Sequence, residues 1–360
     1  MMSGNQYASV FELDSPQLII DLDILDKNLE TMVNGLNGKN LRIHFKSLKC
    51  GGLVRYLMGK GHSSFLCAKL NEAEVLADIG VKNILIANQI VGDIKIARVD
   101  SLKTKANVKV CIDCDEQLSA LSNFAQKFNT SFDVLVEVDI GMNRCGTSPG
   151  KPTLDLVKKI LVSKNIRFSG LQGYDGHLQL MLDRTEKTKK AFESLASLVN
   201  TRRLIENDGT EVPLVTTAGT GTWEFAVQAE GIDEIQPGSF LLMDCIYNEV
   251  RPEFNPSLTV LSTVISRRPG LYVLDAGSKA ISKDFGTPII KGKPNEKIFK
   301  LAEEHTRVEC VDSPLPEIGD KREVITAHCC ATMNLHRSVV ASRNGKVVGV
   351  WPIEASGRYD

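Results

Sequence analysis

Short apolar runs rich in β-branched and aromatic residues recur along the first two thirds of the chain, and most are followed by a stretch with helical spacing. In one such stretch Val75, Leu76 and Ile79 fall on one face, and Gly80 follows as a stop signal. Strands that alternate with helices predict a parallel sheet. The runs lie at 41–45, 64–68, 84–87, 108–112, 132–138, 167–171, 212–216 and 234–240.

Eight such strand–helix units fit a closed (β/α)8 TIM-type barrel, whose usual size is about 250 residues. An open doubly wound sheet is the alternative, because counting strands does not separate the two folds. Before the barrel, an apolar run at 18–22 predicts a strand. Asp23 is then placed to cap a helix that carries Leu25, Leu29 and Met32 on one face.

After about residue 252 the pattern changes to short strands joined by Gly, Pro and Asp turns, without long amphipathic stretches. We therefore expect two domains: a barrel over 23–252, and a C-terminal all-β domain over 253–360 that includes a strand from 1–22. The strands predicted in this second domain lie at 258–265, 271–274, 306–311, 323–326 and 347–351.

Composition narrows the class of partner. The chain of 360 residues carries 43 Lys+Arg and 44 Asp+Glu, a net charge of −1, which gives no electrostatic footprint for nucleic acid or an anionic membrane. No apolar run reaches the roughly 18 residues of a membrane span, and the start of the chain lacks the basic and apolar regions of a signal peptide. Nine cysteines, an odd number, then favour reduced thiols and a cytoplasmic protein.

Four of the predicted barrel strands end in clusters of charged and aromatic residues. Active sites of barrels lie at the carboxyl ends of the strands, so these clusters would share one face. Loops are polar in any protein, which is the alternative explanation, but Lys, Arg, Tyr and His directly at strand ends favour a site. The clusters are RIHFKSLK at 42–49, EVDIGMNRCG at 137–146, QGYDGH at 172–177 and TTAGTGT at 216–222.

A glycine-rich turn, Gly219-Thr220-Gly221, follows the seventh predicted strand and precedes a helix predicted at 222–228. Glycines at such a turn let backbone N–H groups approach an anion, and barrels often bind phosphate after strands seven and eight. A phosphate site together with a lysine at another strand end suggests pyridoxal phosphate. Lys46 is the best placed lysine. The alternatives are Lys49, or a Lys46 that is only a solvated surface residue.

These motifs resemble the fold-type III pyridoxal phosphate enzymes related to alanine racemase, and most of all the metal-dependent group of D-threonine aldolase and D-serine dehydratase. The resemblance covers nearly the whole chain and includes GLQGYDGHLQ at 170–179, AGTGTW at 218–223 and QPGSFLLMD at 236–244. It implies that Lys46 forms the Schiff base, that Arg144 contacts the phenolic oxygen of the cofactor, and that Tyr174 packs on the pyridine ring. The other cofactor-binding positions that it implies are His44, Thr217, Gly219, Thr220 and Gly221.

The segment HCCATMNLH at 328–336 resembles the place where this group binds a divalent metal through an H-x-D or H-x-C pair, here His328 and Cys330. Residues two apart on an extended segment point to the same side, as two ligands of one ion require. A Cys ligand favours zinc over manganese or magnesium. The alternative is a buried structural histidine beside two small core cysteines.

The resemblance implies a lyase acting on D-3-hydroxy amino acids. A D-threonine aldolase-like enzyme would release glycine and an aldehyde, whereas a D-serine or 3-hydroxyaspartate dehydratase would release a 2-oxo acid and ammonia. An amino-acid racemase and a non-catalytic pyridoxal phosphate-binding protein are more distant alternatives. His177 is a candidate for proton transfer, or else a wall residue. Related enzymes imply a homodimer.

Several positions depart from the family pattern. Leu180 stands where the aldolases often have a second His, Phe240 stands where Tyr is common, and the role of His305 is open.

Four other motifs have ordinary explanations. Asp175 is expected in a solvated loop and the charge run 187–190 on a solvated helix face. Cys111 and Cys114 are expected to be two reduced thiols, and an ion pair with Asp139 is the structural alternative for Arg144.

Overall fold

The computed structural model describes residues 9–311 and 314–360, and the chain forms two compact units. The barrel unit comprises Val33–Lys46, Val54–Gly238 and Arg358–Asp360. The β unit comprises Met1–Met32, Ser47–Leu53 and Ser239–Gly357, within the described residues. The predicted boundary at 252/253 concerns independently folding domains and remains a prediction. In the described residues, no helix has the length and apolar character needed to cross a membrane.

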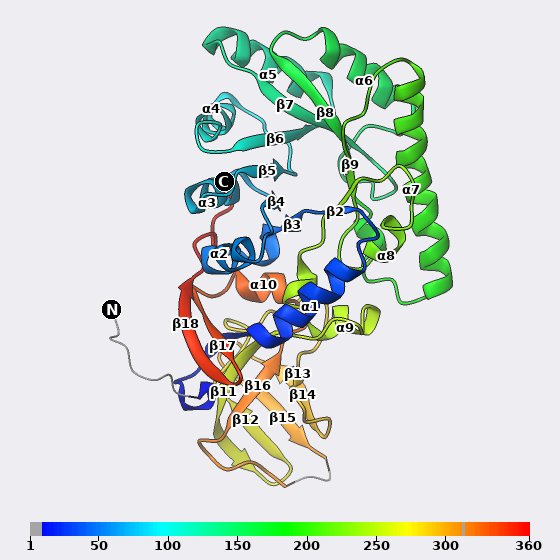
Figure 1. Ribbon diagram of the computed structural model, residues 1–360. Helices are drawn as coiled ribbons and strands as arrows, with labels where there is room; N and C mark the ends of the chain where they lie inside the picture. The colour runs from blue at the N-terminus through cyan, green and yellow to red at the C-terminus, as the bar shows by residue number, and fades with distance from the viewer. Residues whose placement is uncertain (1–8, 312–313) are drawn as a thin grey trace. The chain divides into compact units, whose positions relative to one another are not determined.

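The barrel unit contains an all-parallel sheet whose order is β2-β10-β9-β8-β7-β6-β5-β4-β3. Its two end strands, β2 and β3, are separated in the chain by Arg42 alone; β2 pairs with β10 and β3 with β4. They are one broken first strand, so the sheet closes into the predicted (β/α)8 barrel and the open sheet is excluded (Figure 1). The strands are β2 (Asn40–Leu41), β3 (Ile43–His44), β4 (Ser64–Cys67), β5 (Asn83–Ile86), β6 (Asn107–Ile112), β7 (Phe132–Val138), β8 (Ile166–Gly173), β9 (Val215–Thr217) and β10 (Glu234–Ile235).

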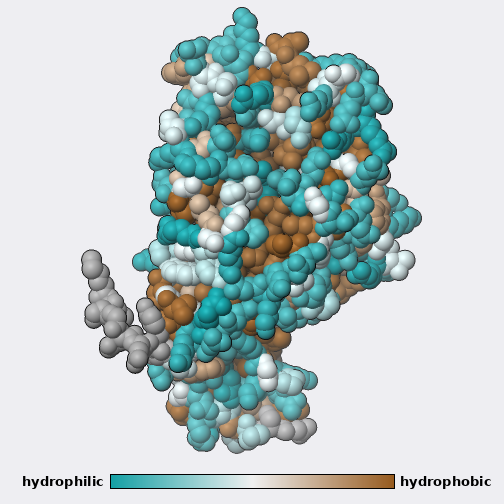
Figure 2. Space-filling model, viewed as in Figure 1, coloured by the Kyte–Doolittle hydropathy of each residue, from teal (hydrophilic) through white to brown (hydrophobic). Residues whose placement is uncertain are grey.

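The barrel helices form where the spacing of apolar residues predicts them. In α3, Val75 and Leu76 are buried, and Gly80 ends the helix with a φ of 102°, a left-handed conformation that glycine adopts without strain. The longest helix, α7, buries Leu195 and Leu198, while Figure 2 shows a mostly hydrophilic outward surface over it. The helices are α2 (Gly51–Gly59), α3 (Leu70–Ile79), α4 (Asp93–Leu102), α5 (Asp115–Phe128), α6 (Lys151–Val162), α7 (Arg184–Asn207) and α8 (Trp223–Ala226).

Two predicted elements of the barrel are longer than the observed ones. The helix predicted at 222–228 is the single turn α8, and the strand predicted at 234–240 ends at Ile235. Pro237 has no backbone N–H for a strand ladder, and the chain turns after it into a 3₁₀ helix at Ser239–Leu241.

The β unit is built on a mostly antiparallel sheet in the order β14-β15-β12-β11-β1-β17-β18, with β16 pairing with both β11 and β13. The N-terminal strand joins this sheet as expected, antiparallel to β11 and parallel to β17; the part of that prediction on residues 1–8 lies outside the described residues. The strands β13, β14 and β17 were not predicted from the sequence. The strands are β1 (Gln17–Asp21), β11 (Leu258–Arg268), β12 (Leu271–Leu274), β13 (Ile289–Ile290), β14 (Glu296–Leu301), β15 (Thr306–Cys310), β16 (Lys321–Ile325), β17 (Ser338–Arg343) and β18 (Lys346–Pro352).

Three helices flank these strands in the chain: α1 (Leu22–Asn34), α9 (Cys245–Val250) and α10 (Cys329–Met333). The cap predicted for the first of them was wrong by two residues. Asp21 Oδ1 accepts hydrogen bonds from the backbone N–H groups of Asp23 and Ile24, at 2.9 and 3.2 Å. Because β1 ends at Asp21, its carboxylate reaches the first turn of α1 and satisfies its amides.

Candidate active site

A cavity at the carboxyl ends of the barrel strands collects four of the predicted site residues: His44, Lys46, Arg144 and Tyr174. His44 and Lys46 lie at the end of β3, Arg144 follows β7 and Tyr174 follows β8, so three strand ends supply them, as the barrel rule requires. His44 Nδ1 accepts a hydrogen bond from the backbone N–H of Lys46 at 3.4 Å, and so supports the turn that carries the lysine. The remaining lining residues are Leu66, Ala68, Ala87, Asn88, Gln172, Ala218 and Gln236.

The Tyr174 ring lies beside both cationic side chains of the cavity. Lys46 Nζ is 5.6 Å from the ring centroid, and the guanidinium carbon of Arg144 is 5.4 Å from it. Cations favour this position because an aromatic face carries negative charge. The ring therefore orders two side chains that arrive from different strands.

Arg144 takes Glu137 as its ion-pair partner, with 4.0 Å between Nη2 and Oε1, so the predicted alternative of an Asp139 pair was wrong. Asp139 instead accepts hydrogen bonds from the backbone of Gly141 and Asn143, both at 3.0 Å. Burial raises the pKa of Glu137, and the Gln89 amide and the Arg144 charge act against that rise. The Glu137 carboxylate on strand β7 therefore lies within ion-pair distance of the Arg144 guanidinium.

The last residue of β9, Thr217, has an unsatisfied hydroxyl. Thr217 is fully buried, and its Oγ1 has no hydrogen-bond partner among the described residues. The next residue, Ala218, lines the cavity and has a φ of 65°, which only a tightly determined backbone imposes on a residue with a Cβ. An orphaned hydroxyl beside the glycine-rich turn fits a phosphate oxygen as its missing partner.

The glycines of that turn are required by Gln179, which sequence analysis did not single out. A Cβ on Gly219 would lie 2.6 Å from Gln179 Oε1, and one on Gly221 would lie 2.1 Å from the Gln179 carbonyl oxygen. The Gly221 N–H donates to Gln179 Oε1 at 2.8 Å. Gln179 stands at the end of the quoted motif GLQGYDGHLQ, which is the signal that could have identified it. Close packing on Gln179 therefore shapes the turn.

Asp175 and Lys187 are buried around the same glutamine, so their predicted solvation was wrong. Asp175 Oδ1 accepts from Gln179 Nε2 at 2.9 Å and from Thr222 Oγ1 at 3.0 Å, and its burial raises the pKa of the carboxyl. Lys187 Nζ donates to the Gln179 carbonyl at 3.1 Å. Both side chains can be buried because hydrogen bonds satisfy their polar atoms: Thr222 and Gln179 for Asp175, and Gln179 for Lys187.

His177 does not line this cavity. The residue is exposed, and its ring lies against Gly141, where an added Cβ would be 3.2 Å from the imidazole. The neighbouring Leu180 is half-buried. The structure therefore gathers Lys46, Arg144 and Tyr174 but not His177.

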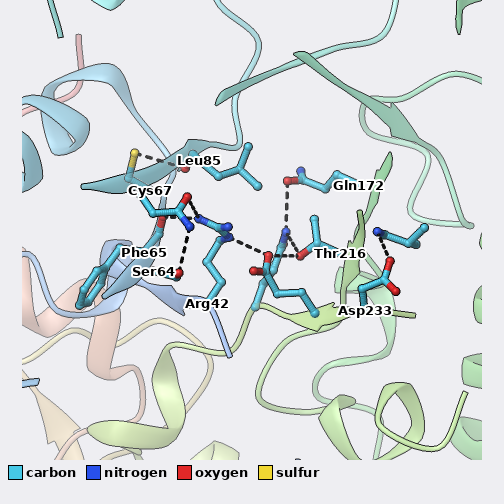
Figure 3. A network of polar contacts seen from close by, with 12 residues as sticks. Arg42, Ser64, Phe65, Cys67, Leu85, Gln172, Thr216 and Asp233 are labelled. Atoms are coloured by element: carbon cyan, nitrogen blue, oxygen red, sulfur yellow. Dashed lines mark hydrogen bonds and ion pairs between the residues drawn. The ribbon is translucent and has the colours of Figure 1, made fainter. Parts of the chain in front are cut away.

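Two further lining residues, Gln172 and Gln236, escaped sequence analysis although both stand in quoted motifs. Their side chains belong to a polar network inside the barrel that also contains Arg42, Thr216 and Glu234. Figure 3 labels three of its members, Arg42, Gln172 and Thr216. Glutamines within otherwise apolar strands were the signal available in the sequence.

In the β unit, His328 and Cys330 stand at the start of a helix, so the extended segment predicted for them was wrong. His328 is the N-cap of α10, with φ −147° and ψ 101°, and Cys330 lies in the first turn. The two side chains still meet. Burial lowers the pKa of His328, but the interaction with Cys330 and the charges of Asp244 and Asp284 outweigh it, so the pKa of His328 is raised overall.

The thiol of Cys330 sits among hydroxyl groups. Its Sγ lies 3.1 Å from Ser47 Oγ and 3.4 Å from Ser239 Oγ, and the Cys329 Sγ is 3.9 Å away. His328 Nδ1 is buried without a hydrogen-bond partner in the described part of the chain. No cluster of three or more His, Cys, Asp or Glu ligands forms among these residues. Asp284 Oδ2 lies 3.8 Å from His328 Nδ1, within ion-pair distance but too far for a hydrogen bond. A buried imidazole nitrogen without a hydrogen bond, next to a thiol, fits two ligands of a zinc-like ion.

Asp244 holds this helix start in place. Its carboxylate accepts hydrogen bonds from the backbone of Tyr247 at 2.8 Å and of Cys329 at 2.9 Å, and burial raises its pKa. Two other positions singled out in the sequence, Phe240 and His305, do not line the cavity. Phe240 is buried against Phe254, with 5.7 Å between ring centroids, and His305 is exposed between β14 and β15. Cys111 and Cys114 are free thiols, as expected.

Comparison with known proteins decides the family. The family model described as the alanine racemase N-terminal domain matches residues 20–245, and a model of the serine dehydratase domain matches 257–342. The chain is 33% identical to a 3-hydroxy-D-aspartate aldolase of Paracoccus denitrificans and 32% identical to a D-threonine aldolase of Arthrobacter sp; each alignment covers 96% of this chain and 93% of the relative. This chain belongs to the alanine racemase-like family of pyridoxal phosphate enzymes. The family identified from the sequence is confirmed.

The solved structures agree. The crystal structure of D-threonine aldolase from Filomicrobium marinum superposes with a TM-score of 0.94 at 33% identity, over 99% of both chains. Full-length similarity to named lyases of this family confirms the predicted enzyme class, a pyridoxal phosphate-dependent lyase. The family also explains why the polar residues gather at the carboxyl end of the barrel.

Proposed function

We propose that the protein is a pyridoxal phosphate- and divalent metal-dependent aldolase that cleaves D-3-hydroxy amino acids to glycine and an aldehyde. The observation that carries this proposal is the cavity in which Lys46, Arg144 and Tyr174 converge, in a chain similar over its full length to a D-threonine aldolase and a 3-hydroxy-D-aspartate aldolase. Lys46 suits the aldehyde of the cofactor, the cationic Arg144 suits its phenolic oxygen, and Tyr174 suits its ring.

In this proposal each side chain of the cavity has one task. Lys46 holds the cofactor covalently, and His44 fixes the turn that presents it. Arg144, backed by Glu137, orients the phenolic oxygen, and Tyr174 supports the ring. The Thr217 hydroxyl and the turn of Gly219, Thr220 and Gly221 receive the phosphate. Bound pyridoxal phosphate supplies the electron sink that stabilises a carbanion at Cα.

We assign the metal to His328 and Cys330. A thiolate ligand favours zinc, and manganese or magnesium would need harder donors than sulfur. A divalent ion there would supply Lewis-acid assistance at the 3-hydroxyl of the substrate. The proposal gives His177 no proton-transfer role, because its ring packs outside the cavity on Gly141.

Dehydration is the second candidate reaction. The serine dehydratase domain model matches 257–342, which includes Cys330. In addition, Leu180 stands at the position where the aldolases often have a second His. In that case the same bound substrate would lose its hydroxyl and yield a 2-oxo acid and ammonia. The family resemblance also supports a homodimer, and the balanced charge and reduced thiols support a cytoplasmic location.

The experiment is a product assay of the protein loaded with pyridoxal phosphate and zinc or manganese. D-threonine, D-3-hydroxyaspartate and D-serine are incubated separately, with Lys46→Ala as the matched control. Glycine with an aldehyde in equal amounts supports the aldolase, whereas 2-oxo acid with ammonia establishes the dehydratase. Formation of the L-enantiomer alone would identify a racemase, and an unchanged substrate with each metal would contradict both proposals.

A further inference from the structure

We propose that Arg42, Glu234 and Thr216 are positioning residues that set the polarity of the cavity floor in the barrel unit. They act through the amides of Gln236 and Gln172, so that the floor presents one neutral acceptor and one neutral donor to a bound ring. The identity of that ring as pyridoxal phosphate rests on the proposed function.

The chain of contacts begins at a buried ion pair. Arg42 and Glu234 are 2% and 4% exposed, and Arg42 Nε donates to Glu234 Oε1 at 2.7 Å (Figure 3). Arg42 Nη1 also donates to the Phe65 carbonyl at 3.3 Å and to Asn83 Oδ1 at 3.1 Å. Arginine stays protonated in proteins and keeps its partner ionised, so Glu234 can only accept hydrogen bonds.

Thr216 connects Glu234 to Gln236 and so determines the orientation of the Gln236 amide. Its Oγ1 lies 2.9 Å from Glu234 Oε1, and because the carboxylate has no proton, the hydroxyl must donate its own. The hydroxyl then has lone pairs left but no proton. The Gln236 atom that lies 2.8 Å from Thr216 Oγ1 is therefore the amide nitrogen, because an amide oxygen there would face another acceptor.

The orientation of Gln236 fixes that of Gln172. Gln236 Nε2 also lies 3.3 Å from Gln172 Oε1, so both its protons are used, and Gln172 Oε1 accepts from Cys111 Sγ as well at 3.4 Å. These bonds use only Gln236 Nε2 and Gln172 Oε1 of the two amides, and they leave Gln236 Oε1 and Gln172 Nε2 without a side-chain partner among the described residues. Both side chains line the cavity beside Lys46 and Tyr174. The floor consequently offers an acceptor from Gln236 and a donor from Gln172.

Thr216 is the point at which this network can be interrupted without substituting a residue that lines the cavity or a member of the ion pair. Thr216→Val keeps the shape and removes the hydroxyl, Thr216→Ala removes it without added bulk, and Thr216→Ser retains it. Without the hydroxyl the Gln236 amide is free to turn over, so donor and acceptor at the floor interchange. We expect Thr216→Val and Thr216→Ala to bind pyridoxal phosphate about fivefold more weakly, as for one lost neutral hydrogen bond. The pH midpoint of their visible absorbance band should shift, whereas Thr216→Ser should match the natural protein in both measurements.

Two results would overturn the inference. One is an unchanged affinity and band midpoint in whichever of Thr216→Val and Thr216→Ala gives a natural thermal unfolding curve. The other is an equal change in Thr216→Ser, since the effect would then come from the methyl group. Failure of the natural protein itself to develop a visible band with pyridoxal phosphate contradicts the proposed function instead, so the two failures are distinguishable.

Discussion

Lys46 Nζ lies 5.6 Å from the centroid of the Tyr174 ring, on the same cavity that Arg144 enters. The lysine comes from the turn after β3 and the tyrosine from the end of β8. Their approach is therefore a product of barrel closure, which brings the first strand round to the others. It also places the Lys46 amine over the face of the Tyr174 ring, which closes one side of the amine to other groups.

Replacing Lys46 with Ala should abolish the visible absorbance band that forms with pyridoxal phosphate, because no other lysine of the described residues lines the cavity. The measurement is an absorbance titration with the cofactor at neutral pH. Lys69→Ala is the matched control, since Lys69 is exposed and follows the lining residue Ala68; its band should equal that of the natural protein. A band that persists in Lys46→Ala would remove Lys46 from its assigned role.

Metal binding should depend on the thiol of Cys330. Cys330→Ser should lose the near-ultraviolet charge-transfer band that a thiolate gives with cobalt(II), and Cys330→Asp should bind manganese in preference to zinc. Ser239→Ala removes a hydroxyl 3.4 Å from the sulfur and should weaken zinc binding by about tenfold. Cys310→Ser, a thiol on β15, is the control. A cobalt spectrum that is the same in Cys330→Ser would show that sulfur is not a ligand.

Gly221→Ala should unfold the turn after β9, because the new Cβ would lie 2.1 Å from the Gln179 carbonyl oxygen, and backbone cannot move aside as a side chain can. We expect a loss of about 3 kcal/mol in the free energy of unfolding and a matching loss of cofactor binding. Gly59→Ala, where a Cβ meets no atom within 4 Å, should instead stabilise α2 by about 0.5–1 kcal/mol. Urea unfolding measures both, and equal effects would contradict the packing argument.

We expect the free energy of unfolding to depend on pH through the titration of Asp175. Burial raises the pKa of this carboxyl above its usual value of 3.8, so the folded chain binds the proton more tightly than the unfolded chain. Its contribution to stability is therefore present at low pH and lost as the pH rises through the raised pKa.

Asp175→Asn keeps an oxygen for Gln179 and Thr222 but does not titrate, so its advantage over the natural protein should grow as the pH rises and then level off. Urea unfolding from pH 4 to pH 8 measures the difference between the two. Glu211→Gln, at an exposed position, should change stability little at each pH. A constant difference for Asp175→Asn across the range would mean that the carboxyl does not titrate in it.

Local signals were enough for most elements of the barrel, but they missed three strands of the β unit and did not predict which polar residues are buried. Gly80 and the apolar spacing before it define α3 without help from the rest of the chain, and the alternation of strands and helices sufficed for the barrel. Asp175 and Lys187 look like surface residues in the sequence, because their burial depends on Gln179 folding back onto a turn more than 40 residues later. The pairing of His328 and Cys330 as metal ligands remains a prediction, and the helix that begins between them depends on Asp244, a residue far away in the chain.

The division of the chain at the Lys46–Ser47 peptide bond limits how this protein can be taken apart. Each compact unit is assembled from three separate stretches, and the first crossover back to the β unit follows directly after the proposed cofactor lysine. A fragment of residues 54–238 would hold seven of the barrel strands but lack Arg42, leaving Glu234 as a buried charge without its counter-ion. Neither unit is therefore a module that can be cut out and fused to another protein. Moving the barrel chemistry into another protein would require nearly the whole chain.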